Sequence, residues 1–315
     1  GCSVGAVVVR ILSGDGTVVF ESDPAPLPGT PDPLAQIGDL VRVTGTVSEF
    51  RPAATNLAIT QINSSNASTQ QLSSGNMLPA PVVIGMGGVM PPTEVIDNDT
   101  NGTVETGPTF DPAQDGIDFW ESYEGMLLQA NNGAVVNETE SFGEITLLPD
   151  NGVWATGLRT PSGGILARSD YGDFNPERFT VDDEILRDLA GATRPGKSMP
   201  DMNVGAQIVG SVVGPLDYSF ANFKIQALTT PAFFSDDLQP ETTQASIDQE
   251  IAFATFNVEN LSVSPSNAAN EAKFDRLAAM IVNNLRSPDL IGIEEVQDDS
   301  GPANNGIVDA TQTWA

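Results

Sequence analysis

The residues best suited to chemistry are three oxygen-bearing side chains near the end of the chain, Asn257, Glu259 and Glu295. They come just after short apolar segments, in the sequences TFNVEN and IGIEEV. One amide oxygen and two carboxylates form a hard, oxygen-only ligand set, which suits Mg²⁺, Mn²⁺ or Ca²⁺ better than zinc. The alternative is ordinary loop structure, because carboxylates commonly follow strands and an asparagine there often stabilises a turn.

These side chains can meet only if neighbouring strands present them. Residues 251–256 and 290–293 are short apolar runs typical of strands. A strand–helix–strand order predicts a right-handed parallel crossover, and ligands bind at the carboxyl ends of the strands in such sheets. We therefore expect Asn257, Glu259 and Glu295 to lie close together.

The segment between the two strands predicts one helix over residues 273–285. Asn270 is the expected N-cap, and Ser287 with Pro288 is expected to end the helix. Apolar residues recur there at the spacing of one helical face: Phe274, Leu277, Ala278, Ile281, Val282 and Leu285.

The two segments also resemble a known family. Residues 255–261 (TFNVENL) resemble the first signature of the endonuclease/exonuclease/phosphatase superfamily, in which a strand ends in Asn-Val before an acidic or polar residue. Residues 288–297 (PDLIGIEEVQ) resemble the second signature, whose glutamate holds the metal. The resemblance implies that Glu295 is this glutamate, that Asn257 is the metal-site asparagine, and that Glu259 matches a less uniform acidic position.

The chain departs from the family in having no histidine. The family needs a catalytic histidine pair, with aspartates and an Asp-x-Asn constellation further on. We therefore expect residues 250–315 to be a truncated N-terminal part of the nuclease domain, with the catalytic His and Asp residues beyond residue 315. On this interpretation the fragment itself is inactive.

The upstream half resembles the predicted extracellular nucleases of bacteria, which place OB-like modules before a C-terminal nuclease domain. Residues 119–127 (FWESYEGML), 142–144 (FGE) and 216–226 (LDYSFANFKIQ) carry this resemblance. Together with the C-terminal signatures it covers most of residues 36–315.

The pattern of short apolar runs and turns predicts a division into five parts. Strands interrupted by glycine, in residues 38–47 and 205–213, indicate two related β units, because a glycine permits the sharp bend of a small barrel. The expected parts are an OB-like β unit (1–76), a connector with an acidic loop (77–110), a second OB-like β-rich unit (111–234), a linker (235–249) and the start of the nuclease domain (250–315).

Composition is that of an acidic globular protein. Hydrophobic residues make up 40% and charged residues 17%, which excludes a disordered chain. The net charge of −29 opposes binding to nucleic acid and anionic membranes by the overall field, so we expect it to serve solubility or to recruit divalent cations. Cys2 stands alone, so no internal disulfide forms; Gly1-Cys2-Ser3 would fit the end of a bacterial lipoprotein signal.

A second candidate metal site lies in the acidic loop. Asp97, Asp99, Asn101 and Glu105 have the alternate spacing of a calcium loop, with Gly102 at the sharp turn. Pro108 stands where the bidentate glutamate belongs, so a solvated acidic turn is the favoured alternative.

Several aromatic residues of the upstream half could stack on nucleobases or pack the β cores. Basic residues are not interleaved with them as nucleic-acid grooves require, so we favour packing. The residues are Phe119, Trp120, Tyr123, Tyr218, Phe220 and Phe223.

These observations predict a mainly β protein with a C-terminal α/β part: two OB-like β-barrel units followed by the truncated start of a four-layer α/β sandwich nuclease domain. The predicted function is that of a secreted bacterial nuclease that uses Mg²⁺ or Mn²⁺ to hydrolyse extracellular DNA, with RNA as a second substrate. One alternative is another phosphoesterase of the superfamily, acting on lipid or inositol phosphates. The other is a non-catalytic β-rich binding or adhesion module.

Overall fold

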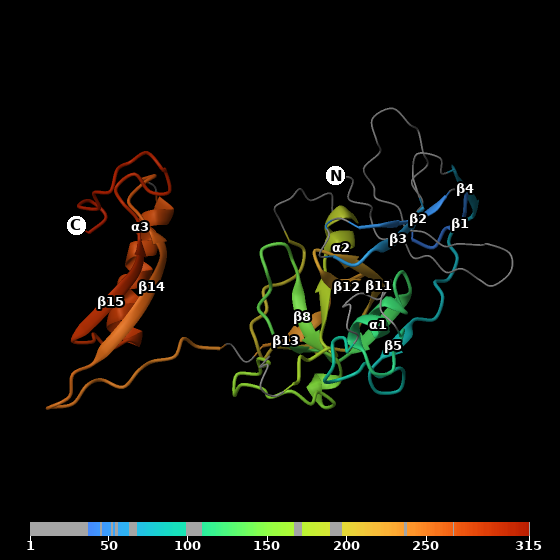
Figure 1. Cartoon of the computed structure of the whole chain (residues 1–315), viewed down its shortest axis with the longest axis horizontal. Helices are drawn as coiled ribbons and strands as arrows, with labels where there is room; N and C mark the ends of the chain where they lie inside the picture. Colours follow the sequence, from blue (N-terminus) through green and yellow to red (C-terminus); the bar gives the residue numbers. More distant parts are fainter. Residues whose placement is uncertain are drawn as a thin grey trace. The chain divides into compact units, whose positions relative to one another are not determined.

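The protein, seen here as a computed structural model, consists of two compact units, Gly1–Leu238 and Gln239–Ala315 (Figure 1). The structure describes residues 37–44, 46–51, 53, 56–62, 68–98, 109–166, 172–189, 197–235, 238–266 and 268–314. The predicted secondary structure is confirmed at the level of class, because strands far outnumber helices in the described residues.

The first unit is built on a nine-stranded mixed sheet. Its order is β13-β10-β7-β8-β9-β12-β11-β6-β5, with parallel pairing only between β9 and β12 and between β5 and β6. The strands are β5 (Val82–Ile84), β6 (Leu127–Asn131), β7 (Ala134–Val135), β8 (Ile145–Leu148), β9 (Phe179–Asp182), β10 (Gln207–Val209), β11 (Ser211–Ser219), β12 (Asn222–Gln226) and β13 (Ala232–Phe234).

Four more strands form two antiparallel pairs. β1 (Leu40–Thr44) pairs with β4 (Ser68–Ser73), and β2 (Val47–Phe50) pairs with β3 (Ile59–Ile62). The predicted OB-like barrels are not confirmed, because the strands of the described ranges form no closed barrel. The large sheet has a linear order that ends at β13 and β5, whereas a barrel needs its first and last strands to pair.

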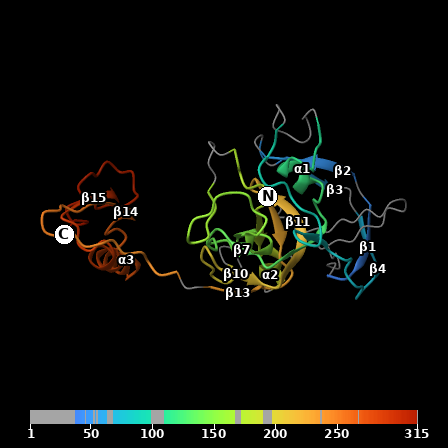
Figure 2. The same cartoon turned by 90° about the horizontal axis from the view of Figure 1, so that it is seen from below.

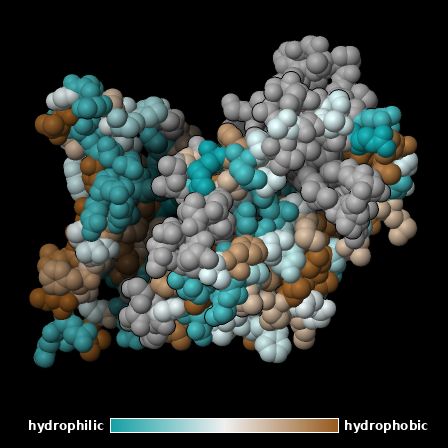
Figure 3. Space-filling view, turned by 45° about the vertical axis from the view of Figure 1, so that its right-hand side comes forward, coloured by the Kyte–Doolittle hydropathy of each residue, from teal (hydrophilic) through white to brown (hydrophobic). Residues whose placement is uncertain are grey.

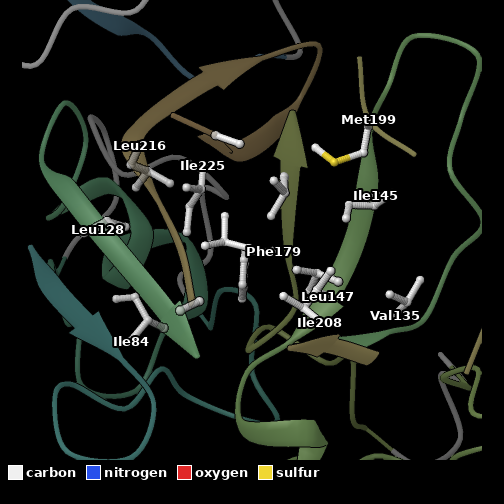
Figure 4. Packing of buried hydrophobic residues seen from close by; sticks show 14 of the residues in the cluster. Ile84, Leu128, Val135, Ile145, Leu147, Phe179, Met199, Ile208, Leu216 and Ile225 are labelled. Carbon is white, nitrogen blue, oxygen red and sulfur yellow. The ribbon is translucent and has the colours of Figure 1, made fainter. Parts of the chain in front are cut away.

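One core holds the large sheet together. Side chains from most of its strands converge on a common apolar cluster, among them Ile84, Leu128, Phe179 and Ile225 (Figure 4). These residues are 0–2% exposed. Strand alternation explains the arrangement, since every second side chain of a strand points to the same face.

Short helices complete this unit. They are α1 (Gly116–Glu121), the 3-10 turn η2 (Asp150–Gly152) and α2 (Glu184–Leu189). α1 contributes Phe119 and Trp120 to the core, with their rings 5.1 Å apart in an edge-to-face arrangement. The indole Nε1 of Trp120 donates a hydrogen bond of 2.9 Å to the carbonyl oxygen of Pro176, which satisfies its only polar atom.

The second unit is a strand–helix–strand crossover, as the sequence predicts. β14 (Phe253–Leu261) and β15 (Leu290–Val296) pair in parallel, and α3 (Ala268–Ala279) lies on one side of the pair (Figure 2). A π-helical turn, η3 (Met280–Asn284), continues α3. In the part of the chain that the structure describes, no helix is long and apolar enough to cross a bilayer.

The helix boundaries differ from the prediction. α3 begins at Ala268, so Asn270 is not the N-cap but lies inside the first turn, where its Nδ2 donates to the carbonyl oxygen of Pro265 at 2.6 Å. Both strands also extend past the predicted ends, through the signature residues. Sequence periodicity underestimates such ends because polar residues can continue a ladder of backbone hydrogen bonds.

One face of the β14–β15 pair is exposed to solvent. Phe253 and Leu290 are register partners, and they are 75% and 51% exposed. Phe274 and Leu277 of α3 are only half-buried. Apolar side chains reach the molecular surface among hydrophilic ones in Figure 3.

Close strand approach yields the first testable prediction. A Cβ atom on Gly214 would overlap the backbone oxygen of Gln226, an atom that cannot move without shifting β12. We therefore expect Gly214→Ala to lower the free energy of unfolding by about 1–3 kcal/mol in urea titrations. Val209→Ala, at a side chain 59% exposed, should change it by less than about 0.5 kcal/mol. Equal stabilities of the two variants would contradict the close packing of β11 against β12.

Candidate metal site and buried carboxylates

The predicted metal ligands lie where the β14–β15 ladder becomes irregular. The strands pair regularly from Phe253 with Leu290 up to Asn257 with Glu294. The next pair is Leu261 with Val296, so three residues of β14 oppose the single residue Glu295. Such a bulge re-aims side chains and is common beside functional sites.

The backbone at this bulge adopts an uncommon conformation. Glu259, Asn260 and Glu295 have φ values of 53°, 57° and 61°, in the left-handed region. Side chains other than glycine reach this region at a cost of roughly 1–3 kcal/mol, and such residues cluster at functional sites. The alternation of faces is broken at this point, so Glu295 is not constrained to the face opposite Glu294.

Hydrogen bonds hold the bulge in place. The Oδ1 atom of Asn257 accepts a hydrogen bond of 2.7 Å from the backbone N–H of Glu259. Across the strands, Nε2 of Gln297 donates to Oδ1 of Asn260 at 2.7 Å. An amide oxygen has two lone pairs, so Asn257 retains one for a further partner.

Glu259 is less suited to a metal than the other two residues. Its carboxylate lies 3.7 Å from the ammonium of Lys273, and the same ammonium donates to the backbone oxygen of Glu259. This contact ties α3 to the bulge. Sequence reasoning missed it, because nothing in the pattern of α3 distinguishes Lys273 from any other solvated lysine.

The two oxygen donors of Asn257 and Glu295 fit a divalent cation that keeps several water ligands, rather than one fully coordinated by protein side chains. No cluster of three His, Cys, Asp or Glu side chains suited to a metal occurs among the described residues. Mg²⁺ commonly binds through one or two carboxylates and keeps several waters, so Asn257 with Glu295 would be sufficient. The assignment of these two residues stays a prediction.

The candidate calcium loop cannot be placed in the same way. Asp99, Asn101 and Glu105 lie outside the residues that the structure describes, and Asp97 lies at the edge of the described part.

In the first unit, two of the three motifs that carried the narrower resemblance, residues 142–144 and 216–226, meet at a buried ion pair. Lys224 of β12 is 1% exposed, and its ammonium lies 2.6 Å from Glu144 and 3.7 Å from Asp182. The ring of Phe220 covers the ammonium at 5.2 Å. Two carboxylates therefore neutralise a lysine that would otherwise be costly to bury.

The aromatic residues of these motifs mainly pack the core, as favoured from the sequence. Phe119, Trp120 and Tyr218 are 4–5% exposed, and the rings of Tyr218 and Phe223 lie 4.9 Å apart. The hydroxyl of Tyr218 also accepts a hydrogen bond from the backbone N–H of Leu57 at 3.0 Å. Phe220 is the exception, at 80% exposed.

Sequence reasoning missed an unusual carboxyl group, Glu124. Its pKa is raised from 4.5 to about 8, mainly by burial and then by the nearby carboxylates of Glu121, Glu49 and Asp217, while a hydrogen bond with the backbone of Thr60 lowers it. Glu121 is only three residues away, but Glu49 and Asp217 are far from Glu124 in sequence, and only the fold brings them near it.

The comparisons with known proteins concern this first unit. Residues 83–235 match the model of a family described as a domain of unknown function (DUF8508). The match begins inside β5 and ends just after β13, so it contains the nine-stranded sheet almost completely. No curated protein and no solved structure matches the chain.

Glu124 predicts a pH-dependent stability. A carboxyl group whose pKa rises on folding, here from 4.5 to about 8, binds more protons when folded, so its contribution to stability is lost as pH rises through that window. The free energy of unfolding should therefore fall between pH 5 and pH 8. We expect Glu124→Gln to reduce this slope and to be more stable than wild type at pH 8 by roughly 1–3 kcal/mol.

The matched control is Glu138→Gln, at an exposed glutamate in the same unit, and it should keep the wild-type slope. Chemical denaturation at several pH values measures both. An unchanged slope in the Glu124 variant would rule out this residue as the source.

Proposed function

We propose that the protein is a metal-dependent phosphodiesterase of the endonuclease/exonuclease/phosphatase type, acting on extracellular DNA and secondarily on RNA. The observation that carries the proposal is the parallel pairing of β14 with β15. It sets Asn257 level with Glu294, beside Glu295, at a bulge of left-handed residues. Neighbouring strands are roughly 4.8 Å apart, so groups at this level can share one ligand.

In this proposal Asn257 and Glu295 hold Mg²⁺ or Mn²⁺. The bound ion would stabilise charge on the phosphate oxygens of the substrate. Asn257 orients its amide oxygen through its contact with the backbone of Glu259, and Lys273 fixes the same turn by its ion pair. Residues 250–315 then correspond to the start of a four-layer α/β sandwich, and the strand pairs of residues 37–73 to part of an OB-like module.

The charge of the chain bears on its partners. At −29, the protein repels a polyanion, so productive contact with DNA depends on divalent cations at the site. A surface this acidic also suits secretion into a salty medium, which we propose as its location. A lipid or inositol phosphate substrate would use the same metal ligands, and substrate assays distinguish it.

Metal binding by the 315-residue chain tests the site directly. Titration with Mn²⁺ in about 0.15 M salt, followed by electron paramagnetic resonance, should show a site that Glu295→Gln weakens by at least about tenfold. Glu271→Gln, an exposed glutamate in the first turn of α3, removes the same charge and should leave that site intact. If both variants bind Mn²⁺ like wild type, the assignment of Glu295 is wrong.

A hydrolysis assay tests whether metal binding by Asn257 and Glu295 is sufficient for activity without a histidine base. None of the 315 residues is a histidine, the side chain whose ordinary pKa lies near neutral, so a metal held by Asn257 and Glu295 lacks the usual base that deprotonates water. We expect this chain not to release acid-soluble nucleotides from DNA with Mg²⁺ or Mn²⁺. Robust turnover that depends on Glu295 would show that another base in the chain serves, and the proposed need for a histidine would fall.

A further inference from the structure

A side-chain hydrogen bond crosses the bulge between β14 and β15. Nε2 of Gln297, which directly follows β15, donates to Oδ1 of Asn260 in β14 at 2.7 Å. Both residues lie close in sequence to the proposed metal ligands, because Asn260 comes shortly after Asn257 and Gln297 shortly after Glu295. The bond therefore joins the two segments that would have to hold one ion.

The backbone ladder does not by itself fix the separation of Asn257 and Glu295. Regular pairing of the two strands reaches Asn257 and resumes only at Leu261, so the register skips residues 258–260. The backbone N–H of Gln297 donates to the carbonyl oxygen of Leu261 at 2.9 Å, which closes the far side of the bulge. Between these two points, the position of Glu295 relative to Asn257 depends on the shape of the skipped segment.

Side-chain contacts hold the skipped segment in an uncommon conformation. Glu259 and Asn260 have φ values of 53° and 57°, in the left-handed region. Lys273 donates to the carbonyl oxygen of Glu259 and so links the segment to α3. The bond from Gln297 to Asn260 links the same segment to the chain that follows Glu295, so this contact acts across the two strands.

The proposed ligands and this bond lie where a hydrated ion can reach them. Asn257, Asn260 and Glu295 are exposed, and Gln297 is half-buried. A hydrogen bond between accessible side chains replaces bonds that both groups would otherwise make to water, so its net contribution to stability is small. We therefore expect it to act on the local arrangement of the bulge more than on the folding of the unit.

We propose that Gln297 is a positioning residue for the metal site, and that its hydrogen bond to Asn260 keeps Glu295 within reach of the ion that Asn257 binds. The inference rests on the proposed function, because it presupposes that Asn257 and Glu295 hold a divalent cation. Mg²⁺ demands near-ideal octahedral geometry, so a displaced carboxylate weakens its binding. Gln297 acts without touching the ion, as outer contacts commonly do when they orient metal ligands.

Titration of the 315-residue chain with Mn²⁺, followed by electron paramagnetic resonance, tests the proposal. Gln297→Met keeps the length of the side chain and removes the donor, so we expect the Kd for Mn²⁺ to rise about threefold to tenfold, the range of one lost hydrogen bond. Asn260→Gly removes the acceptor and permits the left-handed backbone, so it should raise the Kd to a similar extent. The double variant should bind about as weakly as either single variant, because both changes remove the same bond.

Gln244→Met is the matched control. Gln244 is exposed and follows Thr243, whose backbone N–H donates to the carbonyl oxygen of Asn284 at 2.8 Å. Asn284 ends the helical segment that leads away from the bulge, so the control makes the same chemical change outside the proposed site. We expect it to keep the wild-type Kd. Urea denaturation should show that Gln297→Met and Gln244→Met are about equally stable.

Glu295→Gln, measured beside these variants, separates a failure of this inference from a failure of the proposed function. If Glu295→Gln weakens Mn²⁺ binding while Gln297→Met binds like wild type, the metal site stands and Gln297 is not a positioning residue. If Asn260→Gly binds like wild type, or if Gln297→Met loses affinity only together with stability, the role of Gln297 is structural and the inference is overturned. If Glu295→Gln binds like wild type, the metal site is wrong and the inference falls with it.

Discussion

Carboxylates outnumber basic side chains by 42 to 13 in this chain. Few basic side chains are therefore available to pair with the carboxylates that the fold buries. The first unit buries two cations almost completely, Lys224 in β12 and Arg187 in α2, and each is matched by acids. Lys224 meets Glu144 and Asp182, and Arg187 meets Asp183 at 3.3 Å. A buried charge that loses its partner is strongly destabilising, so the pairs of Lys224 constrain how β8, β9 and β12 can align, whereas the Arg187 pair is local to α2.

Two buried carboxylates lack such a basic partner, and their pKa values are raised. Glu124 and Glu177 have no basic partner within hydrogen-bond distance in the described part of the chain, and burial is the largest cause of their raised pKa values. The two groups differ in their surroundings. Glu124 lies near other carboxylates, which raise its pKa, whereas Glu177 lies near one carboxylate, Asp173, which raises its pKa, and near Arg178, which lowers it.

The two units show different kinds of organisation. The first has a dense core, close strand contacts that exclude a methyl group at Gly214, and a span that matches a family model. The second has one helix on one side of two strands, with the other face exposed, and its order depends on backbone and side-chain contacts at the bulge. The proposed metal ligands lie in the second unit.

The sequence by itself determined the local elements whose signals are short in range. The apolar runs at 251–256 and 290–293 and the helical stripe between them were enough to predict a parallel crossover, because such a crossover needs only period, order and length. The sequence also predicts a strand interrupted by glycine in residues 205–213. In the structure, Gly210, with φ 88°, separates β10 from β11.

Tertiary structure decided everything that depends on contacts between distant residues. Periodicity cannot tell an open nine-stranded sheet from two barrels, because both are built from the same short alternating strands and differ only in which edges pair. The bulge that opposes three residues of β14 to Glu295 is a matter of register, which composition does not encode. Glu177 looks like a surface residue between Pro176 and Arg178, yet it is 3% exposed, and that burial exists only in three dimensions.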